Sequence, residues 1–168
     1  EKVILGHVFP EGEGEAEGRR LLDLLATHPA TAQFIATKLV RRFVADQPPS
    51  GLVDRVAATF RDTDGDIKAV LRTLFLSDEF ASAPPKLKRP FTYLVSTLRA
   101  LHTDVALRRQ GRALADWLRR LGQMPFMWPP PDGYPDESAA WATNLLPRWN
   151  FARALVHDQL PGLTVPWD

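Results

Sequence analysis

The chain has 168 residues, of which 45% are hydrophobic and 24% are charged, so it can bury a core and fold without crosslinks. With 21 basic and 20 acidic residues, its net charge of +1 argues against a dedicated polyanion binder. Cysteine is absent, which excludes disulfides, a thiol nucleophile, cysteine-ligated zinc and iron–sulfur clusters. No apolar run approaches the roughly 18 residues that a membrane span requires, so none is predicted.

The first 18 residues pair a short apolar stretch with a run rich in glutamate and glycine. Because such a run buries little surface, the sequence predicts a flexible N-terminal segment over 1–18. The chain begins with Glu1 rather than Met, and we therefore expect this segment to continue from a longer protein. The remainder, 19–168, is expected to form a single helical domain.

Apolar residues recur at helical spacing along most of that remainder. The stretches are 19–27, a second from Pro29 that ends before Pro48, then 50–61, 66–76, 91–101, 107–121 and 138–158. The clearest pattern is Ile67, Val70, Leu71, Leu74 and Phe75, at i, i+3, i+4, i+7 and i+8. No stretch alternates long enough to predict a strand. The fold class is therefore all-α, an irregular bundle of about seven helices with a proline- and tryptophan-rich loop before the last helices.

The segment Asp62-Thr63-Asp64-Gly65-Asp66 is similar to the start of a calcium-binding EF-hand loop. Counted from Asp62, however, the sixth and twelfth positions are Ile67 and Thr73, where that loop needs glycine and glutamate. We expect Asp64 or Asp66 to cap the following helix, with a divalent-cation site as the alternative. The histidines share no ligand-like spacing, so no metal site or cofactor is predicted, and His28 before Pro29 is expected to cap or pack.

Residues 86–120 carry the strongest charge asymmetry, with nine basic and two acidic side chains. One interpretation is a surface for a polyanion such as an acidic polysaccharide, and the other is a solvated helix face. Nucleic acid is disfavoured, because aromatic residues do not alternate with the basic ones as single-strand binding requires. The candidate polyanion-binding residues are Lys86, Lys88, Arg89, Arg108, Arg109 and Arg112.

The segment 123–151 combines prolines, aromatic residues and carboxylates. Prolines lower the entropy that a loop loses on ordering, and rigid aromatics beside polar groups are typical of a sugar or peptide site. The candidate ligand-binding residues are Trp128, Asp132, Tyr134, Trp141, Arg148 and Trp149. The alternatives are a rigid cover, with Trp141 and Trp149 in the core and Arg148 paired to Asp132 or Asp136, and acid–base catalysis by Asp132, Asp136 and Glu137.

Several segments together resemble a known bacterial family. They are Leu5-Gly6, His28-Pro29-Ala30-Thr31-Ala32, Lys38-Leu39, Arg42-Phe43-Val44, Gly65-Asp66-Ile67, Lys86-Leu87-Lys88-Arg89-Pro90, Gly133-Tyr134-Pro135, Trp141 and Arg148-Trp149-Asn150-Phe151. In this order they resemble the C-terminal part of the family catalogued as domain of unknown function 1800, over nearly the whole chain. The resemblance implies an exported protein, periplasmic or secreted, whose gene often lies beside one for a secreted sulfatase-like protein. It implies no catalytic residues.

No recognisable catalytic motif occurs in the chain, and catalytic residues are therefore not assigned. The expected function is a non-catalytic binding or assembly module of an exported bacterial protein, with the 123–151 segment as recognition surface and 86–120 adding electrostatic attraction. The alternative is the C-terminal part of a hydrolase that acts on cell envelope or polysaccharide and needs a preceding region to complete its site. Whether the protein is an enzyme stays open at this point.

Overall fold

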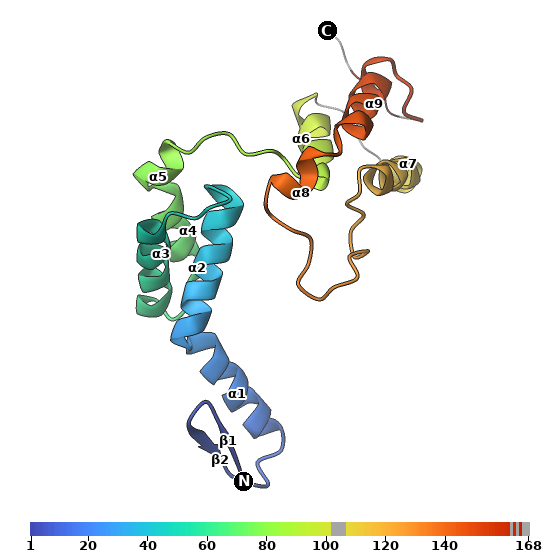
Figure 1. Cartoon of the computed structure of the whole chain (residues 1–168). Helices are drawn as coiled ribbons and strands as arrows, with labels where there is room; N and C mark the ends of the chain where they lie inside the picture. The colour runs from blue at the N-terminus through green and yellow to red at the C-terminus, as the bar shows by residue number, and fades with distance from the viewer. Residues whose placement is uncertain (102–106, 162, 164, 166–168) are drawn as a thin grey trace. The chain divides into compact units, whose positions relative to one another are not determined.

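A computed structural model describes residues 1–101, 107–161, 163 and 165, with the backbone alone described at 107–110. The chain divides into two compact units, residues 1–84 (unit 1) and residues 85–168 (unit 2) (Figure 1). The division falls at Pro84 and Pro85, inside the non-helical segment 83–89, where proline removes backbone donors. The expected division into an N-terminal segment over 1–18 and a single helical domain over 19–168 stays a prediction.

Unit 1 begins with a two-stranded antiparallel hairpin, β1 (Lys2–Ile4) and β2 (His7–Phe9), inside the segment expected to be flexible. The two residues that connect the strands, Leu5 and Gly6, have φ of 51° and 80°. This pair of left-handed residues matches the right-handed twist of a hairpin, although leucine is a rare residue there. Side-chain alternation is too short in three-residue strands to be recognised from sequence.

Five helices follow the hairpin in unit 1. They are α1 (Glu15–Thr27), α2 (Pro29–Phe43), α3 (Ser50–Asp62), α4 (Ile67–Phe75) and α5 (Asp78–Ala81). Two predicted caps are confirmed. His28 Nδ1 accepts a hydrogen bond from the Ala30 N–H at 3.1 Å, and Asp66 Oδ1 accepts one from the Lys68 N–H at 2.8 Å. Caps of this kind are each worth about 1 kcal/mol.

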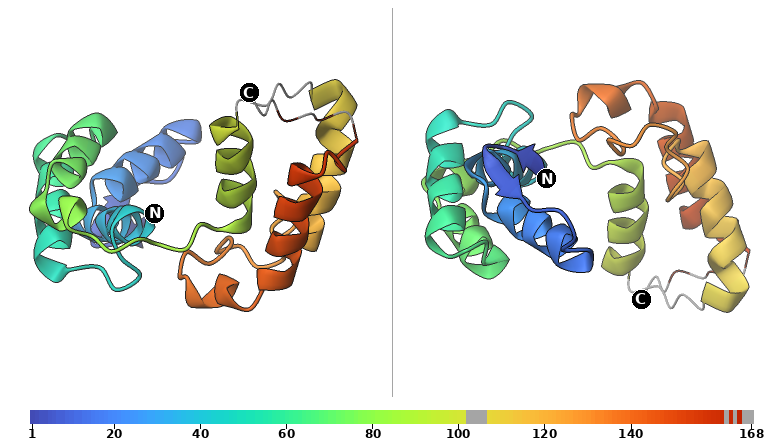
Figure 2. Two further views of the ribbon diagram at one scale, coloured as in Figure 1. Left: turned by 90° about the horizontal axis from the view of Figure 1, so that it is seen from above. Right: turned by 90° about the horizontal axis from the view of Figure 1, so that it is seen from below.

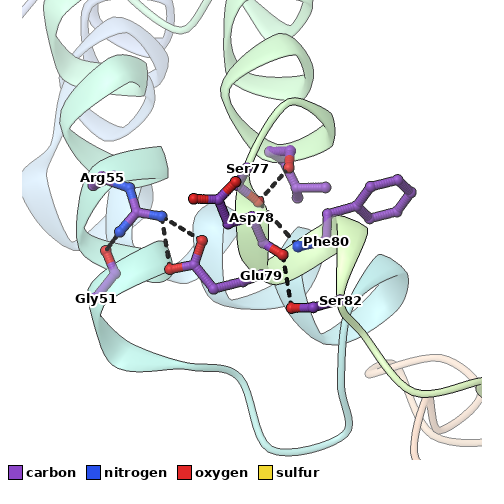
Figure 3. A network of polar contacts seen from close by, with 8 residues as sticks. Gly51, Arg55, Ser77, Asp78, Glu79, Phe80 and Ser82 are labelled. Atoms are coloured by element: carbon purple, nitrogen blue, oxygen red, sulfur yellow. Dashed lines mark hydrogen bonds and ion pairs between the residues drawn. The ribbon is translucent and has the colours of Figure 1, made fainter.

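The core of unit 1 lies between α2, α3 and α4. Its fully buried residues are Ala32, Ala36, Val40, Leu52, Val56, Ala57, Val70 and Leu74. In α4 the helix period correctly predicts Val70 and Leu74 as buried, whereas Ile67 and Phe75 of the same predicted face are exposed. At the edge of the core, Arg55 of α3 donates to both carboxylate oxygens of Glu79 in α5, at 2.8 and 2.7 Å (Figure 3). These bonds hold the pKa of Glu79 below its ordinary value. The pair therefore stabilises unit 1 at neutral pH, and this stabilisation is lost when Glu79 is protonated in acid.

Unit 2 contains α6 (Pro90–Ala100), α7 (Leu107–Arg120), the short α8 (Ala139–Ala142) and α9 (Leu145–Val156). Within this unit α7 and α9 run side by side (Figure 2). The core residues of unit 2 include Leu94, Leu98, Leu114, Leu118, Leu121, Phe151 and Leu155. Phe151 is fully buried and its ring meets those of Tyr93 and Trp117 edge-on, at centroid distances of 5.7 and 5.5 Å. The all-α prediction is confirmed, with a small hairpin added.

Candidate functional site

The loop between α7 and α8, residues 121–138, is named the aromatic loop here. It is fastened to the rest of unit 2 at its start. The buried Gln123 accepts a hydrogen bond on Oε1 from the Phe91 N–H at 2.9 Å, near the beginning of α6. Asn144 donates from Nδ2 to the Leu121 carbonyl at 2.6 Å, which closes the far end of the loop onto its beginning. Asn144 stands at the N-terminus of α9, but its side chain makes this bond instead of capping the helix.

Three aromatic side chains of the predicted set lie in one row, two from the aromatic loop and the third, Trp141, from α8. The ring centroids of Trp128 and Tyr134 are 4.9 Å apart, and those of Tyr134 and Trp141 are 5.9 Å apart. Tyr134 donates its hydroxyl to the Met124 carbonyl at 2.7 Å, and Trp141 donates its indole N–H to the Pro135 carbonyl at 3.0 Å. Trp141 is buried, whereas Trp128 is 38% exposed at the outer end of the row. The row therefore fixes the loop from within and leaves one aromatic face at its surface.

The tip of the loop is a tight turn, in which the Met127 N–H donates to the Met124 carbonyl at 3.2 Å. Pro125 occupies the second position of the turn, and Phe126 the third with φ of 63°. A positive φ at this position favours glycine, and a left-handed conformation costs a residue with a side chain roughly 1–2 kcal/mol. The Phe126 side chain is also fully exposed, and Met127 is 65% exposed. Phe126 and Met127 were not among the residues predicted for the site, because a positive φ leaves no periodic signal in the sequence.

Two carboxylates of the loop, Asp132 and Asp136, have polar partners in unit 2. Asp132 accepts a hydrogen bond from the Trp128 indole N–H at 3.1 Å. Asp136 forms an ion pair with Arg89 at 2.8 Å, and both side chains are about one-fifth exposed. Neither pairs with Arg148, whose guanidinium Nη1 instead donates to the Lys88 carbonyl at 2.8 Å. Arg148 is therefore held by the backbone that precedes α6, rather than by either predicted acid.

Arg148 is buried, with 8% of its surface exposed. Its guanidinium carbon lies 5.4 Å from the centroid of the Tyr93 ring, and the Tyr93 hydroxyl donates to the Arg148 carbonyl at 3.2 Å. Among the described residues its Nε and Nη2 atoms have no hydrogen-bond partner. Burial lowers the pKa of this guanidinium, since desolvation penalises the charged form, and Tyr93 opposes that shift more weakly. A buried cation held in this way costs stability.

The other predicted residues that the structure describes stand on several different elements of unit 2. Trp149, on α9, is 73% exposed and takes no part in the aromatic row. Among the predicted polyanion-binding residues, Lys88 donates to Ser96 at 3.0 Å and Arg89 pairs with Asp136, while Lys86 is half-buried and Arg112 is exposed on α7. Arg108 and Arg109 lie outside the described side chains. Both the ligand-binding and the polyanion-binding roles stay predictions.

An open apolar groove of about 490 Å³ lies in unit 2. Its α6 wall is made by Phe91, Leu94, Val95, Leu98 and Arg99, its α7 wall by Gly111, Leu114, Ala115 and Leu118, and its end by Met124 and Pro125. Met124 and Pro125 belong to the aromatic loop, so the groove and the turn at Phe126 adjoin. The groove was not predicted, because both stripes carry the spacing of ordinary core faces.

In the part of the chain that the structure describes, no three histidine, aspartate or glutamate side chains gather in a way that would hold a metal ion. No helix in that part is both long and apolar enough to cross a membrane.

The fold and the site together define a helical protein whose C-terminal unit presents a fastened aromatic loop beside an apolar groove. The family model described as Protein of unknown function (DUF1800) matches residues 1–166. The chain belongs to this family, and the resemblance found in the sequence is confirmed. No curated protein and no solved structure matches the chain.

Proposed function

We propose that unit 2 is a non-catalytic binding or assembly module, and that the turn at Phe126 with Met127 and Trp128 is its recognition surface. The conformation of Phe126 is the observation that carries this proposal. Neither its backbone, with φ of 63°, nor its packing, with a fully exposed side chain, favours phenylalanine there. A residue that costs stability and contributes nothing to the core is a functional candidate.

The fastening of the loop supports the same proposal. The bonds from Tyr134 to Met124 and from Trp141 to Pro135 hold the tip in place before a partner arrives. Ordering a loop on binding costs free energy, so a loop that is already ordered binds more tightly for the same contacts. Aromatic residues and methionine are also enriched at protein interfaces. This composition favours a protein partner for the tip.

The compartment and the partner are part of the proposal and rest on the family resemblance. The protein is proposed to be exported, periplasmic or secreted, and to assemble with a secreted sulfatase-like protein. A polysaccharide is the second ligand to test, because the exposed face of Trp128 lies beside the Asp132 carboxylate and sugar sites combine such groups.

Replacing Phe126 with glycine is expected to separate binding from stability. Glycine adopts a positive φ without strain, so the variant should gain about 1 kcal/mol in its free energy of unfolding. It should also lose at least about tenfold in affinity for the partner, because the apolar contact is removed. Urea denaturation measures the first effect. Titration of tryptophan fluorescence with polysaccharides and with the sulfatase-like protein measures the second.

Two exposed tryptophans provide the matched comparison for that experiment. Trp128→Ala removes the aromatic face beside Phe126 and should weaken binding, whereas Trp149→Ala removes an exposed indole elsewhere and should not. If Phe126→Gly and Trp128→Ala both bind as the unchanged protein does, the tip is not the recognition surface.

A hydrolase that requires a preceding region remains the alternative proposal. It needs Asp132 or Asp136 as acid or base, yet these carboxylates bind Trp128 and Arg89, which favours a structural role. Hydrolysis of cell-envelope polysaccharide by a longer form of the protein, lost in Asp132→Asn or Asp136→Asn at unchanged stability, would favour the enzyme. We expect Asp136→Asn, which lies outside the proposed recognition surface, to leave partner binding by unit 2 unchanged.

A further inference from the structure

We infer that the groove between α6 and α7 binds the apolar face of an amphipathic helix whose flanks are acidic. This inference concerns a second surface of unit 2 and does not depend on the role proposed for the turn at Phe126. It rests on a glycine in one wall of the groove, on the length of both walls and on the charge at their rim.

The glycine is Gly111, the fifth residue of α7. Glycine inside a helix costs about 1 kcal/mol relative to alanine, so it needs a reason. Its backbone does not supply one, because φ is not positive, and a Cβ built there would meet no heavy atom of the described residues within 4 Å. Packing among the described residues therefore does not require glycine. What Gly111 does is widen the groove, so that a partner backbone can approach α7 closely.

The walls of the groove fit a helix in length and in pattern. On α6 the lining runs from Phe91 to Arg99, and on α7 from Gly111 to Leu118, about two helical turns on each side. A helix that lies in a groove presents anchors at i, i+3 or i+4, and i+7, which span the same two turns. An extended acyl chain could lie in the groove, but it has no side chains that repeat with this helical spacing.

Two exposed arginines lie at the rim of the groove, while the neighbouring Asp116 is paired with Arg119. Arg99 is exposed and is the charged side chain among the described lining residues, which include no aspartate or glutamate. Arg112 is exposed and borders the α7 wall, because it follows Gly111 and stands three residues before Ala115 on the same side of the helix. A partner with acidic side chains beside its apolar stripe complements this rim, whereas one with basic flanks is repelled.

The test uses a synthetic helical peptide of about 18 residues, with leucines at i, i+3, i+4 and i+7 and glutamates on its flanks. We expect the full chain to bind it, and Gly111→Leu to weaken binding at least about tenfold by filling the groove. Gly18→Leu is the matched control, because Gly18 also lies in a helix with no heavy atom within 4 Å of a built Cβ, and should bind normally. Fluorescence anisotropy measures each affinity.

Further experiments test the contribution of charge to binding and the class of ligand that binds. Arg99→Glu should weaken binding of the acidic peptide, while the same change at the exposed Arg72 of α4 should leave binding unchanged. A peptide with lysine flanks should bind at least about tenfold more weakly than the acidic one. The inference is overturned if the unchanged protein does not bind the acidic peptide, if Gly111→Leu binds it equally well, or if palmitate vesicles bind and the peptide does not. Because Phe126→Gly leaves the groove intact, its result does not bear on these outcomes.

Discussion

Replacing Phe151 with alanine is expected to lower the free energy of unfolding of unit 2 by about 3–5 kcal/mol. The side chain is fully buried, and its ring contacts Tyr93 of α6 and Trp117 of α7, so one truncation removes packing from three helices. A loss of this size is a large share of the roughly 5–15 kcal/mol that stabilises a typical domain. We therefore expect unit 2 of this variant to be largely unfolded near 37 °C.

Tryptophan fluorescence is a suitable measurement, because all of the tryptophans in the sequence follow residue 84. Phe126→Ala is the matched control, since it deletes the same atoms from a fully exposed side chain and should change stability by less than about 0.5 kcal/mol. If Phe151→Ala cost no more than Phe126→Ala, the packing of α6, α7 and α9 described here would be wrong.

The helices and their caps could be predicted from sequence, because the signals that set them are local. Leu74 and Val70 fall on one face of α4 through the helix period, and Asp66 caps that helix from the position just before it. His28 and Pro29 likewise mark the start of α2 by their order alone. Such features depend on residues within one or two turns of each other.

The arrangement of the site could be predicted only in part, because its contacts join residues far apart in the chain. Arg148 binds the Lys88 carbonyl across 60 positions, and Asp136 pairs with Arg89, which the sequence had assigned to a polyanion surface. Composition identified the aromatic loop, but it left open whether Trp141 lies at a ligand surface or in the core. The positive φ of Phe126 is set by one turn and leaves no trace in the pattern.

Two residues of unit 2 therefore cost stability in different ways. Phe126 strains the backbone and exposes an apolar side chain, and Arg148 places a charge in a site where only 8% of the residue is exposed. Natural proteins keep such residues where function requires them. Substitution of Arg148 tests whether a destabilising residue is also kept inside the unit, where packing and function are harder to separate.

Replacing Arg148 with methionine is expected to raise the free energy of unfolding by about 1–2 kcal/mol. Methionine has a similar volume and no charge, so it removes the desolvation cost and the unpartnered Nε and Nη2 atoms, at the loss of one bond to the Lys88 carbonyl. The sign agrees with the lowered pKa of Arg148. A cation whose pKa is lower in the folded state destabilises the fold wherever it stays charged, and that cost fades only at strongly alkaline pH.

Arg148→Lys separates the charge from the shape of the side chain. It keeps a buried cation and loses the planar group that lies over Tyr93, so it should be less stable than the unchanged protein while the methionine variant is more stable. Urea denaturation at neutral pH ranks the three proteins. If Arg148→Met lost more than about 1 kcal/mol, Arg148 would be a net stabilising residue of unit 2 and its burial would need no functional explanation.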